Sequence, residues 1–362
     1  FQKMERVQHL KFFGIKKFPK KRIKSLYILS NCKNFQMDRK KFIASLSLAS
    51  TAHISSASGH KYMNRDRRDR LQDSVKKFSG FRLAHITDPH IYPKNQAPEK
   101  MANALRHIQT QKEPPVGILS GGDSIMDALG ASKEYTREQW KLWHDVINTE
   151  VKVPFYPCIG NHDVWGWAMK EGQKDGGDYG KKWAMDELKL KERFYSFSIE
   201  NWEFIVLDSV YPSFKSGSGY TARIDEQQFK WLENKLKSIN KEKHICFLSH
   251  IPIISFCPFF DGMNEEKGKP NGWLVPHEWM HMDARRIKNL FKNFPNIRAC
   301  ISGHIHLQDS VEYLDIKYFC NGALCGNWWN PNHPKYQEFG PAYAMLDFSN
   351  TGEVSCTMTP YQ

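Results

Sequence analysis

Residues 81–90 read FRLAHITDPH, an apolar run from Phe81 to Ile86 followed by Asp88 and His90. A short apolar run with polar residues directly after it is typical of a buried β-strand. The same pattern recurs at Val116–Leu119, Phe155–Ile159, Ile245–Leu248 and Ala299–Ile301. We therefore expect five buried strands, each followed by a loop that carries polar side chains.

Helices and hairpins are predicted between these strands. The helix candidates, which follow a period near 3.6 residues, are Ala97–Thr110, Thr136–Asn148, Asp225–Ser238 and His281–Phe294. Asp225 stands where a helix N-cap is expected. The hairpin candidates are Phe194–Ile199 with Glu203–Asp208 around Asn201-Trp202, and Val311–Leu314 with Lys317–Cys320 around Asp315-Ile316. This mixture predicts an α/β protein with two sheets.

Each of the five strand ends delivers residue types that bind metal ions. The motifs are Asp88-Pro89-His90, Gly121-Gly122-Asp123-Ser124, Gly160-Asn161-His162-Asp163, Ser249-His250 and Gly303-His304-Ile305-His306. A lone Asp-x-His is more often a surface loop, so no single motif is strong. Loops beyond the carboxyl ends of strands are, however, where open α/β sheets bind ligands. Together the five motifs predict one metal site at which the loops converge.

The set D-x-H, G-D, G-N-H-D, H and G-H-x-H resembles the calcineurin-like metallophosphoesterase superfamily, and its D-x-H form is closer to the cyclic-nucleotide phosphodiesterase-like branch. The resemblance spans residues 81–306, and the segment to Gln362 fits the closing hairpins of the family. His90 in place of glycine, and the lack of a G-D-x-x-Y motif, argue against a purple acid phosphatase. The resemblance implies a four-layer α/β/β/α sandwich of two mixed sheets flanked by helices.

The resemblance also implies a role for each motif residue. The implied ligands are Asp88, His90 and His306 for a first metal ion, Asn161, His250 and His304 for a second, and Asp123 as the bridge between them. His162 is expected to donate a proton to the leaving group or to stabilise the transition state. Either Asp163 or Asp127 is expected to orient the His162 ring, or else these two are ordinary loop residues. Asn161, His162 and His304 are the expected contacts of the substrate.

This ligand set determines the expected chemistry. Imidazole and carboxylate ligands suit two divalent ions such as Mn, Fe or Zn. Two ions about 3.5–4 Å apart activate a bridging hydroxide as the nucleophile and neutralise charge during an in-line displacement. We expect a phosphohydrolase, foremost a phosphodiesterase for a small-molecule phosphodiester such as a cyclic nucleotide. A phosphomonoesterase of the same fold is one alternative, and a non-catalytic interaction scaffold, which would tolerate damaged ligand positions, is another.

The net charge of +13 comes from the N-terminal part of the chain. Residues 1–80 hold 20 of the 52 Lys and Arg residues and only 5 of the 39 Asp and Glu residues. The other 282 residues therefore carry a charge of −2. Because a nucleic-acid-binding domain carries its basic charge on the domain itself, we predict no specific nucleic acid partner.

Residues 37–59 have the layout of an export signal: a basic start at Met37, a mildly apolar run and then small residues. Residues 1–36 then read as a non-native or disordered basic extension, 60–80 as a linker and 81–362 as the metallophosphoesterase domain. Export would place the protein in the periplasm or cell envelope, whereas an ordinary amphipathic helix here would leave it cytoplasmic. The apolar run is too short and too rich in serine for a transmembrane segment. The oligomeric state stays open.

Three long connections are candidates for the rim of the pocket: Trp165–Trp183, Phe256–Trp279 and Gly322–Trp329. Their aromatic side chains either stack on a nucleobase or sugar ring of the substrate or pack onto the sandwich. His277 and His281 are interpreted as loop or helix-start residues, not as ligands. The cysteines within apolar runs are expected to be small buried hydrophobes, and a disulfide stays open for an exported chain.

Overall fold

The computed structural model describes residues 79–169, 179–213, 217–261, 273–330, 332 and 338–362. The expected export signal, the extension before it and the linker up to residue 78 lie outside the described residues. Within the described ranges, no helix combines the length and apolarity that a membrane crossing requires.

The first sheet has five strands in the order β13-β12-β1-β2-β3. Their bounds are Gly80–Ile86 (β1), Ile118–Ser120 (β2), Phe155–Pro157 (β3), Ala342–Ser349 (β12) and Val354–Pro360 (β13). Strands β1, β2 and β3 are parallel, so the loops that carry Asp88, Asp123 and Asn161 leave the sheet at one edge. Strand β12 pairs antiparallel with both β1 and β13, which confirms a closing hairpin.

The second sheet has six strands in the order β10-β11-β9-β8-β5-β4. Their bounds are Tyr195–Ile199 (β4), Trp202–Val206 (β5), His244–Leu248 (β8), Ile297–Ser302 (β9), Asp309–Tyr313 (β10) and Ile316–Cys320 (β11). Strands β5, β8, β9 and β11 are parallel, so the loops with His250 and His304 also leave at a common edge. A separate hairpin of β6 (Val210–Pro212) and β7 (Tyr220–Ala222) was not expected from the sequence.

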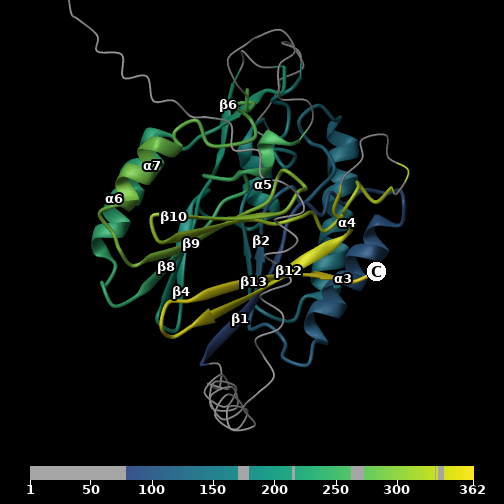
Figure 1. Cartoon of the computed structure of the whole chain (residues 1–362). Helices are drawn as coiled ribbons and strands as arrows, with labels where there is room; N and C mark the ends of the chain where they lie inside the picture. Colours follow the sequence, from purple (N-terminus) through teal and green to yellow (C-terminus); the bar gives the residue numbers. More distant parts are fainter. Residues whose placement is uncertain (1–78, 170–178, 214–216, 262–272, 331, 333–337) are drawn as a thin grey trace, which may run out of the picture. The chain divides into compact units, whose positions relative to one another are not determined.

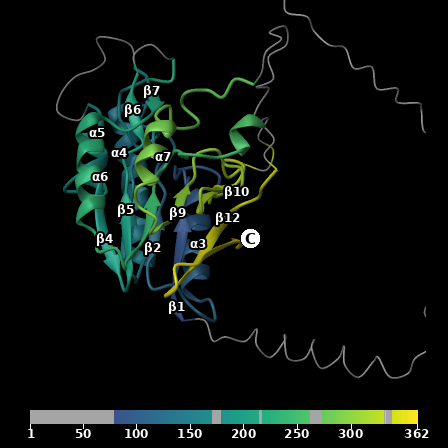
Figure 2. The same cartoon turned by 60° about the vertical axis from the view of Figure 1, so that its left-hand side comes forward.

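Helices cover the outer faces of both sheets. Their bounds are Ala97–Gln109 (α3), Lys133–Glu150 (α4), Lys181–Glu187 (α5), Glu226–Ser238 (α6) and Ala284–Phe291 (α7), with a 3-10 turn, η1, at Cys257–Phe259. Figure 1 shows the two sheets between α6 and α7 on one side and α3 and α4 on the other, and Figure 2 shows the same elements turned by 60°.

The alternation of side chains along each strand divides the core into layers. In β8, Ile245 and Phe247 pack in the cluster under α6 and α7, whereas Cys246 and Leu248 pack between the sheets. In β1, Ala84 and Ile86 belong to the cluster with α3 and α4, whereas Phe81 and Leu83 face the other sheet. A strand buried on both faces reads as a continuous apolar run. The four-layer α/β/β/α sandwich is confirmed.

The turns of the two predicted hairpins lie one residue earlier than the sequence indicated. Trp202 and Ile316 begin strands β5 and β11 instead of lying in the turns. The Trp202 ring is fully buried, and its Nε1 donates to the Ser349 carbonyl at 2.9 Å, so packing fixes it in the strand. The second turn is made by Leu314 and Asp315, both with positive φ, which is the backbone that a two-residue hairpin turn requires.

The helix predicted at His281–Phe294 is shorter than expected. The backbone N–H groups of His281 and Met282 donate to the carbonyl of Pro252 in a loop and to that of Ala222 in β7, at 3.1 and 2.9 Å. These bonds hold the backbone of His281 and Met282 outside the helix, and α7 begins at Ala284. The N-cap at Asp225 is confirmed, because its Oδ1 accepts the Gln228 N–H at 2.8 Å.

The cysteines of the described part serve as packing residues. All are free thiols, and all except Cys356 are buried. Cys158 and Cys246 lie in the cluster between the sheets, and Cys300 lies in the cluster under α6 and α7. Their apolar neighbours in the sequence thus indicated their role correctly.

Candidate metal centre

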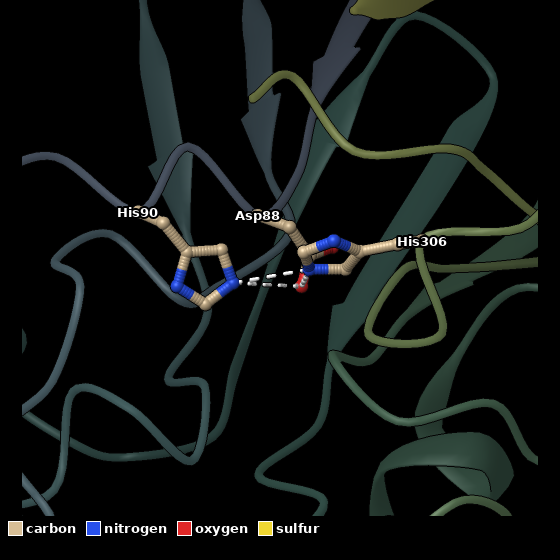
Figure 3. Close-up of side chains that lie close together, drawn as sticks. All are labelled: Asp88, His90 and His306. Atoms are coloured by element: carbon tan, nitrogen blue, oxygen red, sulfur yellow. Dashed lines mark hydrogen bonds and ion pairs between the residues drawn. The ribbon is translucent and has the colours of Figure 1, made fainter. Parts of the chain in front are cut away.

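Three side chains from two loops converge where the strands end. Asp88 and His90 follow β1, and His306 follows β9, and Figure 3 shows the three side chains pointing toward one another. The Nε2 atoms of His90 and His306 are 3.1 Å apart. They lie 3.8 and 3.4 Å from Oδ1 of Asp88. We call these three residues the first ligand group.

A second ligand group lies beside the first and consists of Asn161, His250 and His304. Nε2 of His250 is 2.9 Å from Oδ1 of Asn161 and 3.0 Å from Nδ1 of His304. Asp123 connects the two groups, because its Oδ2 lies 3.2 Å from Nε2 of His250 and 3.6 Å from Nε2 of His90. A single carboxylate oxygen therefore faces both groups, as expected of a bridging ligand.

The spacing of these donor atoms fits shared cations. Metal–ligand bonds of about 2.0–2.2 Å place neighbouring donor atoms about 3.0–3.4 Å apart. In addition, Oδ1 of Asp88 is buried and has no hydrogen-bond partner among the described residues. Burying a carboxylate oxygen without a partner is costly unless a cation satisfies it. The residues thus fit one divalent ion in each group.

The backbone at the ligands is strained. Five ligand residues have left-handed φ angles: Asp88 at 53°, His90 at 42°, Asp123 at 53°, His304 at 73° and His306 at 63°. Such conformations cost of order 1–3 kcal/mol each for residues other than glycine and persist only where the surroundings enforce them. Here the loops enforce them on one another, since the N–H groups of Asp88 and His90 donate to the carbonyls of Gly122 and Asp123.

Two glycines allow the loops to approach this closely. A Cβ atom on Gly160 would lie 2.1 Å from the backbone nitrogen of Asp123, and one on Gly303 would lie 1.9 Å from Oγ1 of Thr87. Neither position therefore has room for a side chain. Thr87, which the sequence did not single out, donates its hydroxyl to Oδ2 of Asp88 at 2.6 Å and so leaves Oδ1 facing the histidines.

The protonation states suit metal binding. Burial lowers the pKa of His304 to about 3 and holds the pKa of His90 well below its ordinary value, so both rings are neutral. Burial raises the pKa of Asp123, but His250 and His162 outweigh it and keep this pKa well below normal. Burial lowers the pKa of His250, yet the charge of Asp123 raises it to about 9. The positive charge of protonated His250 balances the negative charge of Asp123. A metal ion that binds here would supply this positive charge instead and release the proton.

His162 lies next to the candidate ligand Asn161 and is half-buried. Its Nδ1 is 2.6 Å from the carbonyl oxygen of Met126. Because a carbonyl only accepts, Nδ1 carries the hydrogen and Nε2 remains available to a substrate. The backbone N–H of His162 also donates to Oδ1 of Asp123 at 2.8 Å, which ties the backbone of His162 to the Asp123 carboxylate.

The contacts of Asp163 and Asp127 fit the alternative left open by the sequence, that both are structural loop residues. The Asp163 carboxylate accepts the backbone N–H groups of Ser124 and Gly160, at 2.7 and 2.9 Å, and so holds together the loops of Asp123 and Asn161. Asp127 accepts the N–H of Leu129 at 2.8 Å within its own turn. Among the described hydrogen bonds, neither carboxylate reaches the His162 ring. The Met126 carbonyl holds the ring instead.

The ligand groups open into a cleft of about 190 Å³. Asn161, His162 and His304, the three expected substrate contacts, line this cleft, whereas Asp88, His90 and His250 are buried behind it. The other walls are formed by Asp123, Tyr220, Asp261, Trp279, Ile305, His306 and Trp328. A larger hollow of about 550 Å³ beside α4 and α5 contains none of the ligands, so volume alone does not mark the site.

Two of the three expected rim segments have described residues that line the cleft. Phe256–Trp279 contributes Asp261 and Trp279, and Gly322–Trp329 contributes Trp328. In Trp165–Trp183, the rings of Trp165, Trp167 and Trp183 are buried in the core, so packing is their role. Tyr220, which belongs to the unexpected strand β7, was missed because a three-residue strand carries no clear periodicity.

His277 and His281 lie in the loop before α7, as interpreted from the sequence. Nδ1 of His281 is 2.9 Å from Oδ1 of Asp283, and neither histidine belongs to a convergent ligand group of the described residues. His277 and His281 therefore stay interpreted as loop residues.

Residues 81–308 match the family model of the calcineurin-like phosphoesterases. The chain belongs to this family. As a calcineurin-like phosphoesterase it is a metal-dependent phosphoric ester hydrolase, and the family fold implies a dinuclear centre of divalent metal ions. The two ligand groups joined by Asp123 lie within the matched residues.

The proteins similar to this phosphoesterase include two named phosphodiesterases and one solved structure with the same fold. A 3',5'-cyclic adenosine monophosphate phosphodiesterase of Vibrio vulnificus is 20% identical over 282 residues, covering 76% of this chain and 89% of the relative. Sphingomyelin phosphodiesterase 2 of Caenorhabditis elegans is 22% identical over 68% of this chain, which spans only 40% of that protein. A dimetal phosphatase from Danio rerio has the same fold, with a TM-score of 0.52, 13% identity and coverage of 78% of this chain and 100% of that one.

Proposed function

We propose that this phosphoesterase hydrolyses small phosphodiesters at a centre of two divalent ions. The observation that carries the proposal is Oδ2 of Asp123, which faces the first ligand group through His90 and the second through His250. The proposed ligands are Asp88, His90 and His306 for one ion, Asn161, His250 and His304 for the other, and Asp123 for both. Their imidazole and oxygen donors suit Mn, Fe or Zn.

The protein groups divide the remaining tasks. Bound ions supply Lewis acidity and lower the pKa of water that attacks phosphorus. Asn161 and His304 line the cleft and orient the phosphoryl oxygens there. His162 is the proposed proton donor to the leaving oxygen in its doubly protonated form, because Nδ1 donates to the Met126 carbonyl and Nε2 then carries the proton that is transferred. We propose no role for a side chain as the nucleophile.

The walls of the cleft favour a diester over a monoester. A phosphate monoester carries up to two negative charges at neutral pH, whereas a diester carries one. Enzymes that bind the extra charge commonly use Lys or Arg. Among the described residues that line this cleft none is a Lys or Arg, and Asp261 adds a carboxylate. The names of the two similar phosphodiesterases point the same way, and cyclic nucleotides are the first natural substrates to test.

Diester preference is directly measurable. With manganese added, we expect kcat/KM for bis-p-nitrophenyl phosphate to exceed that for p-nitrophenyl phosphate by about tenfold or more, since none of the described residues that line the cleft offers a cationic side chain to the second charge. Both esters release p-nitrophenolate, so one absorbance assay compares them. A preference for the monoester would overturn the diesterase proposal and support the phosphomonoesterase alternative.

A further inference from the structure

Trp328 lies against the ring systems of the centre. Its ring centroid is 4.3 Å from that of His90 and 4.6 Å from that of His306, with tilts of 45° and 34°. The ring of His162 is 5.9 Å away. Trp328 is half-buried and lines the cleft, so part of the indole is covered by the first ligand group and part faces the space for the substrate.

The loop that carries Trp328 is fastened to the loop of the first ligand group. The N–H groups of Leu324 and Cys325 donate to the carbonyls of Thr87 and Asp88, at 2.8 and 3.3 Å. The neighbouring indole, Trp329, donates its Nε1 to the Pro89 carbonyl at 2.7 Å. The position of Trp328 is therefore set before any substrate arrives, which lowers the entropy cost of binding against it.

The backbone at Trp328 is strained in the same way as the backbone at the candidate ligands. Trp328 and Trp329 both have left-handed φ angles, 56° and 58°. A bulky residue rarely adopts this conformation, and such strain collects at functional sites. Of the two neighbouring indoles, Trp329 is buried and already fills the core, so packing does not require a strained, half-buried indole at position 328.

We propose that Trp328 determines which esters the enzyme accepts, by stacking on a planar ring attached to the phosphate. A preformed apolar ring face beside bound phosphate favours a flat unsaturated substituent over a small alkyl group. The inference rests on the proposed function for its substrate class, phosphodiesters, but not for the contact itself. Trp328 is a specificity-determining residue here and is given no part in the bond-breaking step.

The test compares two diesters with the same leaving group, phenyl p-nitrophenyl phosphate and methyl p-nitrophenyl phosphate, on the manganese-loaded full chain. The phenyl-to-methyl ratio of kcat/KM is measured for the wild type and for Trp328→Ala, so that intrinsic ester reactivity cancels. We expect the ratio to fall about tenfold in Trp328→Ala and to be largely retained in Trp328→Phe. Trp273→Ala is the matched control, because Trp273 is exposed and does not line the cleft.

A purely structural role for Trp328 gives a different result. If the indole only supports His90 and His306, Trp328→Ala lowers metal content and slows both esters equally, and an unchanged ratio overturns the proposal. Calorimetric binding of phenylphosphonate and methylphosphonate to the metal-loaded protein gives a second test that needs no turnover. A phenyl preference that Trp328→Ala removes supports the inference even if diester hydrolysis fails. No preference, or no binding of either phosphonate, contradicts it.

Discussion

Replacing Asp123 with asparagine is expected to remove metal and activity together. Oδ2 of Asp123 is the atom that both ligand groups share, at 3.2 Å from Nε2 of His250 and 3.6 Å from Nε2 of His90. Asparagine keeps the shape but removes the negative charge that both ions need. Loss of several kcal/mol of charge stabilisation corresponds to a fall in kcat/KM of about a thousandfold or more. Elemental analysis and diester hydrolysis on the same preparation measure both effects.

The matched control for this variant is Asp145→Asn. Asp145 is an exposed residue of α4 that pairs with Lys141, outside the site. We expect this control to keep the metal content and turnover of the wild type. An Asp123→Asn protein that still holds two ions per chain and turns over normally would show that Asp123 is not the bridge.

Replacing His162 with alanine is expected to leave the metal in place and to remove turnover. His162 lines the cleft, and its ring is held by the Met126 carbonyl at 2.6 Å. Loss of a general acid typically costs about 10²–10⁴-fold in rate. The loss should be larger for a diester with an alkyl leaving group than for one that releases p-nitrophenolate, since a good leaving group needs little protonation. Rates for both ester types give this comparison.

His144→Ala is the control for this second variant. His144 lies on α4 and pairs with Glu187 at 2.7 Å, away from the ligand groups. Equal losses of metal in His162→Ala and Asp123→Asn would contradict the separate roles. So would a His162→Ala enzyme whose loss of rate is the same for alkyl and p-nitrophenyl leaving groups.

The parts of the fold that the sequence predicted well are those with strong local patterns. β8 and β9 are short buried strands whose apolar runs are bounded by polar residues, and both lie within one or two residues of the prediction. The start of α7 was misplaced because the N–H groups of His281 and Met282 donate to carbonyls of residues distant in the sequence, Pro252 and Ala222, which no local pattern reveals. Likewise, α5 and the hairpin of β6 and β7 are too short to show a period.

The candidate ligands were predictable because each one follows an apolar run. Parallel strands bring such loops to one edge, so the seven residues indicated a site before any contact was known. The groups that hold these residues in place could not be predicted from the sequence. Met126 acts through its backbone carbonyl, which every residue has, and Asp163 acts on the backbone of Ser124 and Gly160, which depends on how two loops pack. The position of Trp328 over His90 likewise arises only from tertiary structure.

The metal content of the wild-type protein tests the central claim most directly. The protein is loaded with manganese, desalted and measured by elemental analysis, and the same sample is assayed for diester hydrolysis before and after a chelator. Two ligand groups that share Asp123 predict close to two ions per chain and activity that the chelator removes. A content near zero or one ion, or hydrolysis that survives complete removal of metal, would contradict the proposed centre.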